Sequence, residues 1–149
     1  MACGKSSREA EEMSATETIA GWVARTSYKD IPPDAVKAAK ETMFDCLGLI
    51  LAGSVESLGQ IIHEHVREQG GPSESTVLGS GIRTSPANAA LANATMGMAL
   101  DYDPEPQMMA IAAGVLAIAE KTSASGRALI EAFVTGAELG WMIGETTVI

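Results

Sequence analysis

Two acidic residues, Asp101 and Asp103, follow a long segment of small and apolar residues that runs from Ala89 to Leu100. A carboxylate can act as a general acid or base when its surroundings tune its pKa and hold it within hydrogen-bond reach of a substrate. The alternative interpretation is a pair of solvated acids at a helix end. Residues two apart on a helix do not share a face, so spacing alone favours that alternative.

The segment His63-Glu64-His65 holds both histidines of the chain and is the first place to look for a metal site. Histidines two apart on a helix point in different directions, and a third ligand at a metal-binding spacing is missing. We therefore expect a solvated helix face here. The glycines of Gly79-Ser80-Gly81 follow a possible strand, but the rest of a nucleotide-binding fingerprint does not follow, so they predict a turn.

The sulfur-containing side chains have an ordinary structural interpretation. We expect both cysteines, Cys3 and Cys46, to be reduced, and Cys46 to pack in the core because it falls on the apolar stripe of a predicted helix. Four methionines flank the segment around Asp101, and flexible core filling explains them. They are Met96, Met98, Met108 and Met109.

Length and composition predict one domain with closely packed helices. At 149 residues a single core is feasible, and because aromatic residues make up only 4% of the chain, small side chains must let the helices approach closely. The net charge of -9 argues against binding nucleic acid or an anionic membrane surface. The longest apolar run, Met108 to Ala119, is shorter than the roughly 20 residues of a membrane span. We expect a cytoplasmic protein.

The helix-starting and helix-ending residues of the sequence predict an all-α fold, a compact stack of about six helices over residues 14–149. Residues 1–13 are polar and aperiodic, which predicts a disordered tail. A capping box at Ser14-Ala15-Thr16-Glu17 begins the first helix, and we expect its apolar residues to face inward. These residues are Ile19, Trp22 and Val23.

Prolines and glycines delimit the remaining helices. We expect them at about Pro33–Ala52, Glu56–Gln69, Pro86–Leu100, from a hinge at Pro104–Pro106 to Lys121, and at Arg127–Ile143. The fourth and fifth should form a hairpin. In the third, four apolar residues are expected to face inward, namely Leu58, Ile61, Ile62 and Val66. Residues Ser75–Leu78 are β-prone, but no partner strand is evident, so an extended loop is equally consistent with the sequence.

The ordered motifs of the chain resemble those of the MmgE/PrpD family of lyases. The segment from Asn93 to Asp103 is similar to the family's Asn-Gly-x-x-x-His-x-Leu/Met-Asp-Phe/Tyr-Asp-Asp pattern, with Met98 at the histidine position and Pro104 at the last Asp. Ile31–Val36 resembles the opening of a long family helix, and Phe44–Gly48 resembles Leu-Asp-x-Leu-Gly. The resemblance extends from about Thr16 to Gly144, the amino-terminal helical part of the family fold.

The resemblance implies dehydration or decarboxylation of a citrate-like acid, the activity of 2-methylcitrate dehydratase and cis-aconitate decarboxylase, without a metal or organic cofactor. It places Asp101 and Asp103 beside the substrate as the candidate catalytic residues. Met98 stands where the family motif has a histidine. The segment Pro104–Met108 is too short to hold the family's His-Pro-Ser loop, which carries a second histidine. Family chains are several times longer, so we expect a shortened member that is inactive alone.

Electrostatics supports that expectation, because no Lys, Arg or His occurs between Thr84 and Glu120. A citrate-like anion near Asp101 would meet repulsion without a local countercharge. Arg83 and Arg127 are the nearest arginines to consider, but neither lies on an anion-binding motif, and Lys121 fits a solvated helix end.

Two other hypotheses remain open. The chain could be a helical module that pairs with itself as a homodimer, or with a full-length relative, through uncovered apolar surface. It could also be a gene fragment without a selected role.

Overall fold

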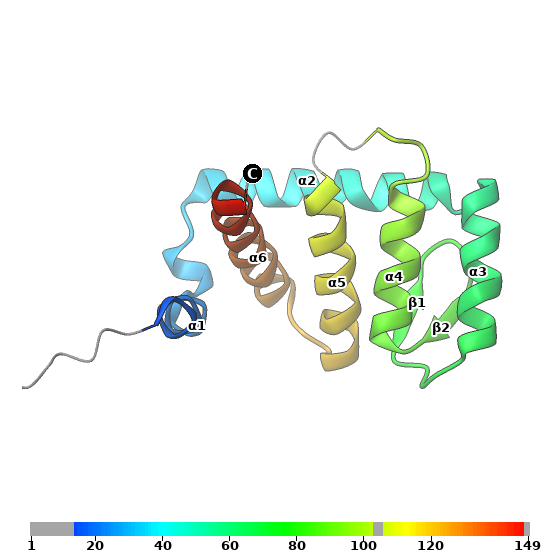
Figure 1. Cartoon of the computed structure of the whole chain (residues 1–149), viewed down its shortest axis with the longest axis horizontal. Helices are drawn as coiled ribbons and strands as arrows, with labels where there is room; N and C mark the ends of the chain where they lie inside the picture. Colours follow the sequence, from blue (N-terminus) through cyan, green and yellow to red (C-terminus); the bar gives the residue numbers. More distant parts are fainter. Residues whose placement is uncertain (1–13, 103–105, 148–149) are drawn as a thin grey trace, which may run out of the picture.

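The computed structural model describes residues 14–102 and 106–147, and the predicted tail at 1–13 lies outside them. In the described residues, six α-helices and one small hairpin confirm the predicted helical class (Figure 1). The α-helices are α1 Ala15–Arg25, α2 Pro33–Gly53, α3 Ser57–Gln69, α4 Pro86–Gly97, α5 Pro106–Thr122 and α6 Gly126–Thr147. The strands are β1 Ser75–Val77 and β2 Ile82–Thr84, and a single 3-10 turn, η1, covers Tyr28–Asp30.

The helices begin where the sequence predicts. Ser14 and Glu17 form the expected capping box, in which the Glu17 amide donates to Ser14 Oγ at 3.2 Å and the Ser14 amide donates to Glu17 Oε2 at 2.8 Å. These bonds satisfy amides that the first turn of a helix leaves without partners. Pro33 occupies the first turn of α2, and Ser85 caps α4 by accepting a bond from the Asn88 amide.

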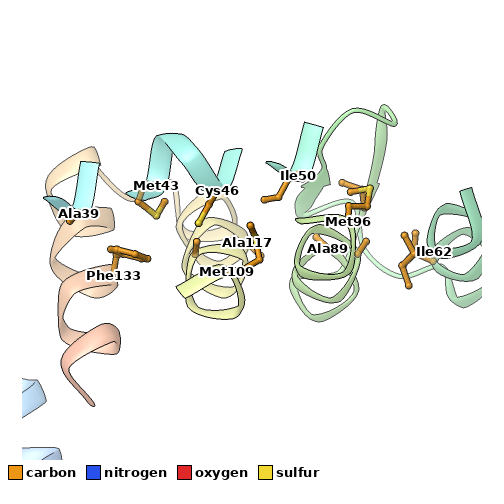
Figure 2. Packing of buried hydrophobic residues seen from close by; sticks show 14 of the residues in the cluster. Ala39, Met43, Cys46, Ile50, Ile62, Ala89, Met96, Met109, Ala117 and Phe133 are labelled. Carbon is orange, nitrogen blue, oxygen red and sulfur yellow. The ribbon is translucent and has the colours of Figure 1, made fainter. Parts of the chain in front are cut away.

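Helix α2 lies across the ends of α4, α5 and α6 (Figure 1). Its buried side chains recur every three or four residues, so one stripe of the helix faces the other three. In Figure 2 this stripe points toward Phe133 of α6, Met109 of α5 and Met96 of α4. The α2 side chains in the stripe are Ala39, Met43, Cys46 and Ile50. The predicted burial of Cys46 is confirmed, and Cys3 lies outside the described residues.

Helix α4 is the centre of the core and packs against α2, α3, α5 and the hairpin. Its residues Ala89, Ala92 and Met96 are fully buried. Two small side chains on the helix let several neighbours approach at close range, which offsets the scarcity of large aromatic residues. The predicted hairpin of α4 with α5 is confirmed, because these two helices share the most extensive contact in the fold. The four methionines also contribute to the core as expected.

The chain forms a hairpin at residues 75–84, where the sequence left an extended loop as an equal alternative. Strand β1 pairs antiparallel with β2, Ser75 opposite Thr84 and Val77 opposite Ile82. Gly79 and Gly81 have φ values of 76° and 70°, the left-handed region that glycine enters without steric cost, so the predicted turn is confirmed. Distant groups hold the strand, since Ser75 Oγ donates to the Ala117 carbonyl of α5 at 2.7 Å.

Two predictions of inward-facing side chains are confirmed only in part. On α1, Ile19 and Trp22 are half-buried but Val23 is exposed and no side chain is fully enclosed, because α1 packs only at the margin of the bundle. On α3, Leu58 and Ile61 are exposed while Ile62 and Val66 are buried. The reason is that α4 covers a narrower strip of α3 than the apolar pattern suggests.

Within the described residues, no single helix has both the length and the apolar character needed to cross a membrane. The pair α2 and α3, which is bent by 88°, reaches that threshold only when the two are taken together.

Candidate functional site

Asp101 is the predicted catalytic residue that the structure describes. Helix α4 ends at Gly97, three residues before the predicted Leu100, and a turn continues to Asp101, whose amide donates to the Met98 carbonyl at 3.2 Å. The φ of Asp101 is 53°, a left-handed conformation that side chains other than glycine adopt uncommonly and that frequently ends a helix. Its side chain is exposed, and the adjacent Tyr102 is 71% exposed.

Asp103, the second predicted catalytic residue, lies outside the described residues. Asp101 is therefore a solvent-facing carboxylate at a helix end, as the alternative interpretation of solvated acids predicts. Such a group can contact a ligand that arrives from solvent, but chemistry on a carbon-carbon bond needs it desolvated and paired with further groups.

The cations nearest to this segment in sequence lie at the opposite end of α4 and α5 (Figure 1). Arg83 precedes α4 and Lys121 lies in the last turn of α5, whereas Asp101 lies between the end of α4 and the start of α5. A helix of 12 residues such as α4 is about 18 Å long, beyond the screening length of roughly 8–10 Å at physiological salt. Neither cation can neutralise an anion at Asp101.

Both cations are also engaged by acids. Arg83 Nη1 lies 2.5 Å from Glu120 Oε1, and Glu120 also accepts bonds from the amide and hydroxyl of Thr76 at 2.7 and 2.5 Å. Burial alone would raise the pKa of Glu120, but the hydrogen bonds from Thr76 and Arg83 lower it overall. Lys121 is exposed in the last turn of α5, as expected, and its Nζ also lies 3.1 Å from Glu74 Oε2.

Arg127, the third candidate cation, stacks over a ring. Its guanidinium carbon lies 5.7 Å from the centroid of Tyr28, and the Tyr28 amide donates to Glu131 Oε2 at 2.6 Å. These contacts join η1 to the amino-terminal half of α6. Arg127 therefore has a structural explanation and lies far from Asp101 along the chain.

Asn93, the first residue of the motif that includes Asp101, is a structural residue. Its side chain is 2% exposed; Oδ1 accepts from the Leu78 amide at 2.9 Å and Nδ2 donates to the Thr76 carbonyl at 3.0 Å. Buried polar groups are almost always satisfied in this way. The motif therefore includes a residue that fixes the hairpin to α4 as well as the exposed acid.

The predicted solvation of the His63-Glu64-His65 segment is wrong for His63. This side chain is 9% exposed and its Nε2 lies 3.1 Å from Met96 Sδ, while Glu64 and His65 are exposed. Since His63 is buried and His65 is exposed, the two histidines do not share a face of α3, as the spacing predicts. Among the described residues, no three His, Cys, Asp or Glu side chains converge on a position that could hold a metal ion.

A cavity of about 480 Å³ lies between β1 and the facing parts of α5 and α6, and Asp101 is not among its lining residues. Leu78, Leu116 and Leu129 supply apolar wall, and its polar groups on Thr76, Asn93 and Glu120 already bond to protein partners. The cavity offers apolar surface without a cation to orient a di- or tricarboxylic acid.

Comparison with known proteins agrees with the motif order. The family model described as the MmgE/PrpD N-terminal domain matches residues 17–148. The chain belongs to the MmgE/PrpD family. No curated protein and no solved structure matches the chain significantly. The MmgE/PrpD N-terminal domain is thus represented here by the helical bundle and its small hairpin, and the match covers the segment that contains Asp101.

Sequence reasoning missed the residues of this MmgE/PrpD domain that bind across elements. The bonds of Glu120 to Thr76 and Arg83 span 44 and 37 residues of sequence, so no local pattern indicates them. The burial of His63 was missed because the buried stripe of α3 includes Gly59 and His63 beside Ile62 and Val66, so an apolar pattern does not indicate it.

Proposed function

We propose that this chain carries the acidic segment of a site that dehydrates or decarboxylates a citrate-like acid, and that the chain alone does not complete that site. The observation that carries the proposal is the separation of Asp101 from the two cations that are nearest to it in sequence. Asp101 lies at the end of α4 in a family domain, while Arg83 and Lys121 lie at the other end of α4 and α5, each paired with an acid.

Charge explains why the site is incomplete. Di- and tricarboxylic acids carry two or three negative charges at neutral pH, and the chain itself has a net charge of -9. Binding beside an exposed carboxylate requires cations within a few ångströms, since Coulomb attraction across water falls to about 1 kcal/mol at 4 Å. The cations and imidazoles that such a site needs would have to come from another polypeptide or from additional residues of the same polypeptide.

Titration with cis-aconitate tests this proposal through the backbone amide signals of the chain. We expect no saturable shift at Asp101 or Tyr102, because no Lys, Arg or His between Thr84 and Glu120 offsets the repulsion. A matched titration with uncharged tricarballylic triamide separates charge repulsion from a general lack of affinity. Saturable binding of cis-aconitate at Asp101 that Asp101→Asn abolishes would overturn the proposal.

A second candidate function is self-association through the outer face of α2. Phe44 is 80% exposed, Leu51 is 52% exposed, and Val55, just beyond the helix, is 75% exposed. Phe44, Gly48 and Leu51 recur at i, i+4 and i+7, so they share one face, opposite the stripe that packs on the bundle. Exposed apolar surface of this kind is typical of interfaces.

The proposed occupant of this face is a second copy of the chain. Antiparallel pairing about a two-fold axis at Gly48 would place Phe44 of each copy near Leu51 of the other, which is the self-complementary arrangement of an isologous interface. Gly48 has no neighbouring atom within 4 Å of the position of a Cβ, so the two helices can approach closely there. A second copy adds no new kind of cation and is not expected to create turnover.

Sedimentation equilibrium distinguishes this function from the first. We expect the wild-type chain to dimerise and the double variant Phe44→Ser with Leu51→Ser to be monomeric. Leu91→Ser is the matched control, because Leu91 is 48% exposed but lies on α4. A wild-type monomer at high concentration, or a Leu91→Ser effect as large as that of the double variant, would contradict self-association through α2.

A further inference from the structure

A histidine is buried in the interface between α3 and α4. His63 is 9% exposed, beside Ile62 and Val66 of the same helix, and its Nε2 lies 3.1 Å from Sδ of the fully buried Met96. Helix α3 is at the edge of the bundle and packs mainly on α4, with a smaller contact to β2 (Figure 1). The imidazole therefore lies in the contact that attaches α3 to the fold.

No carboxylate of the elements around His63 is buried beside the ring, where it could stabilise the protonated form. Helix α4 contains no ionisable residue from Pro86 to Gly97, and β2 contributes only Arg83, which is paired with Glu120. On α3 itself, Arg67 lies one turn further and is positive, while Glu64 and Glu68 are exposed. In the adjoining connections, Glu56 is exposed and Glu74 is paired with Lys121.

Protonation is consequently unfavourable while α3 is packed. Burial, and secondarily the positive charge of Arg67, lower the pKa of His63 below its ordinary value of 6.5. Above pH 6.5 the ring is neutral both in the packed and in the opened state, so pH has no effect through this group. Below pH 6.5 the opened state binds the proton more readily, so the packed state loses relative stability as the pH falls.

We propose that the contact of His63 with Met96 is an acid-sensitive joint, at which uptake of a proton by the imidazole releases α3 from α4. Release would expose the buried apolar residues Ile62 and Val66 to solvent. Met96 lies one residue before the end of α4, so the joint is adjacent to the turn that positions Asp101. The proposal does not depend on the lyase activity or on the self-association proposed above.

Hydrogen exchange of the α3 amides tests the joint in the full chain. The measurement compares pH 7.5 with pH 5.5, with each rate corrected for the intrinsic pH dependence of exchange. For one proton, we expect α3 protection in the wild type to fall by up to about tenfold per pH unit below pH 6.5. His63→Gln, a polar side chain that does not titrate, should remove this dependence. His65→Gln is the matched control, since His65 is exposed on the same helix, and it should behave like the wild type.

Three results would overturn the proposal. They are α3 protection independent of pH in the wild type, the same pH dependence in His63→Gln, and an equal loss of protection in all helices. If His63→Gln does not fold, the wild-type imidazole signals give the answer, because the chain has only two histidines. A His63 ring that titrates at or above pH 6.5 would then refute the joint.

Discussion

Asn93 of α4 donates a hydrogen bond from Nδ2 to the carbonyl of Thr76 in β1, at 3.0 Å. The other atom of the same amide, Oδ1, accepts a bond from the Leu78 amide at 2.9 Å. One fully enclosed side chain thus satisfies two backbone groups of the hairpin and fixes it to the central helix. This residue belongs to the motif that identifies the family, and its role is in the scaffold.

Asn93→Ala is predicted to lower the free energy of unfolding by about 2–4 kcal/mol, because it leaves two half-buried backbone groups of the hairpin without these partners. Urea denaturation measures the change. Asn88→Ala is the matched control in the same helix, since half-buried Asn88 donates to one carbonyl, that of Gly70, at 3.0 Å. If Asn93→Ala lowers the free energy of unfolding no more than Asn88→Ala does, the two hydrogen bonds of Asn93 to the hairpin contribute little to stability.

Two glycines of α2 are predicted to respond to alanine in opposite directions. A Cβ at Gly53 would overlap the backbone carbonyl of Met96, so Gly53→Ala should cost about 1–3 kcal/mol of stability through overpacking. A Cβ at Gly48 would meet nothing of the same chain within 4 Å, so Gly48→Ala should add about 0.5–1 kcal/mol to the stability of the monomer through helix propensity. Thermal or urea unfolding of both variants checks the pair, and equal effects would contradict the close approach of α2 to α4.

The network of Glu120 with Arg83 and Thr76 is predicted to contribute modestly. All its members are at the surface, so Glu120→Gln should cost no more than about 1 kcal/mol, and the cost should shrink in about 1 M salt. The folded-state pKa of Glu120 is lowered, so its contribution is present above the ordinary value of 4.5 and is lost as the pH falls through the folded pKa. Urea denaturation at low and high salt measures it. A cost of several kcal/mol that salt does not change would argue against this description.

The helices of this chain are largely predictable because local signals set their ends. The capping box at Ser14, the proline at Pro33 and the Ser85-Pro86 pair each place a helix start within about one residue of its observed position. The sequence did not decide between the hairpin and an extended loop, because strands of three residues carry little pattern of their own. Its pairing depends on Asn93 and Ser75, whose partners are distant in sequence.

Burial on α3 illustrates the limit of apolar pattern. His63 is enclosed and Ile61 is 63% exposed, so polarity alone gives the wrong orientation for both. The position of the neighbouring α4, and not hydrophobicity, decides which strip of α3 is covered. The candidate site has the same limit. The sequence places Asp101 at a helix end, but it does not show that Arg83 and Lys121 form ion pairs at the other end of α4 and α5.

Turnover of 2-methylcitrate and cis-aconitate by the purified chain tests the central claim most directly, namely that the acidic segment is present while the rest of the site is not. The assay compares the wild type with Asp101→Asn, whose side chain is exposed, so that folding is preserved. We predict product formation at the uncatalysed rate for both proteins and both acids. Turnover well above that rate in the wild type, lost in Asp101→Asn, would contradict the account.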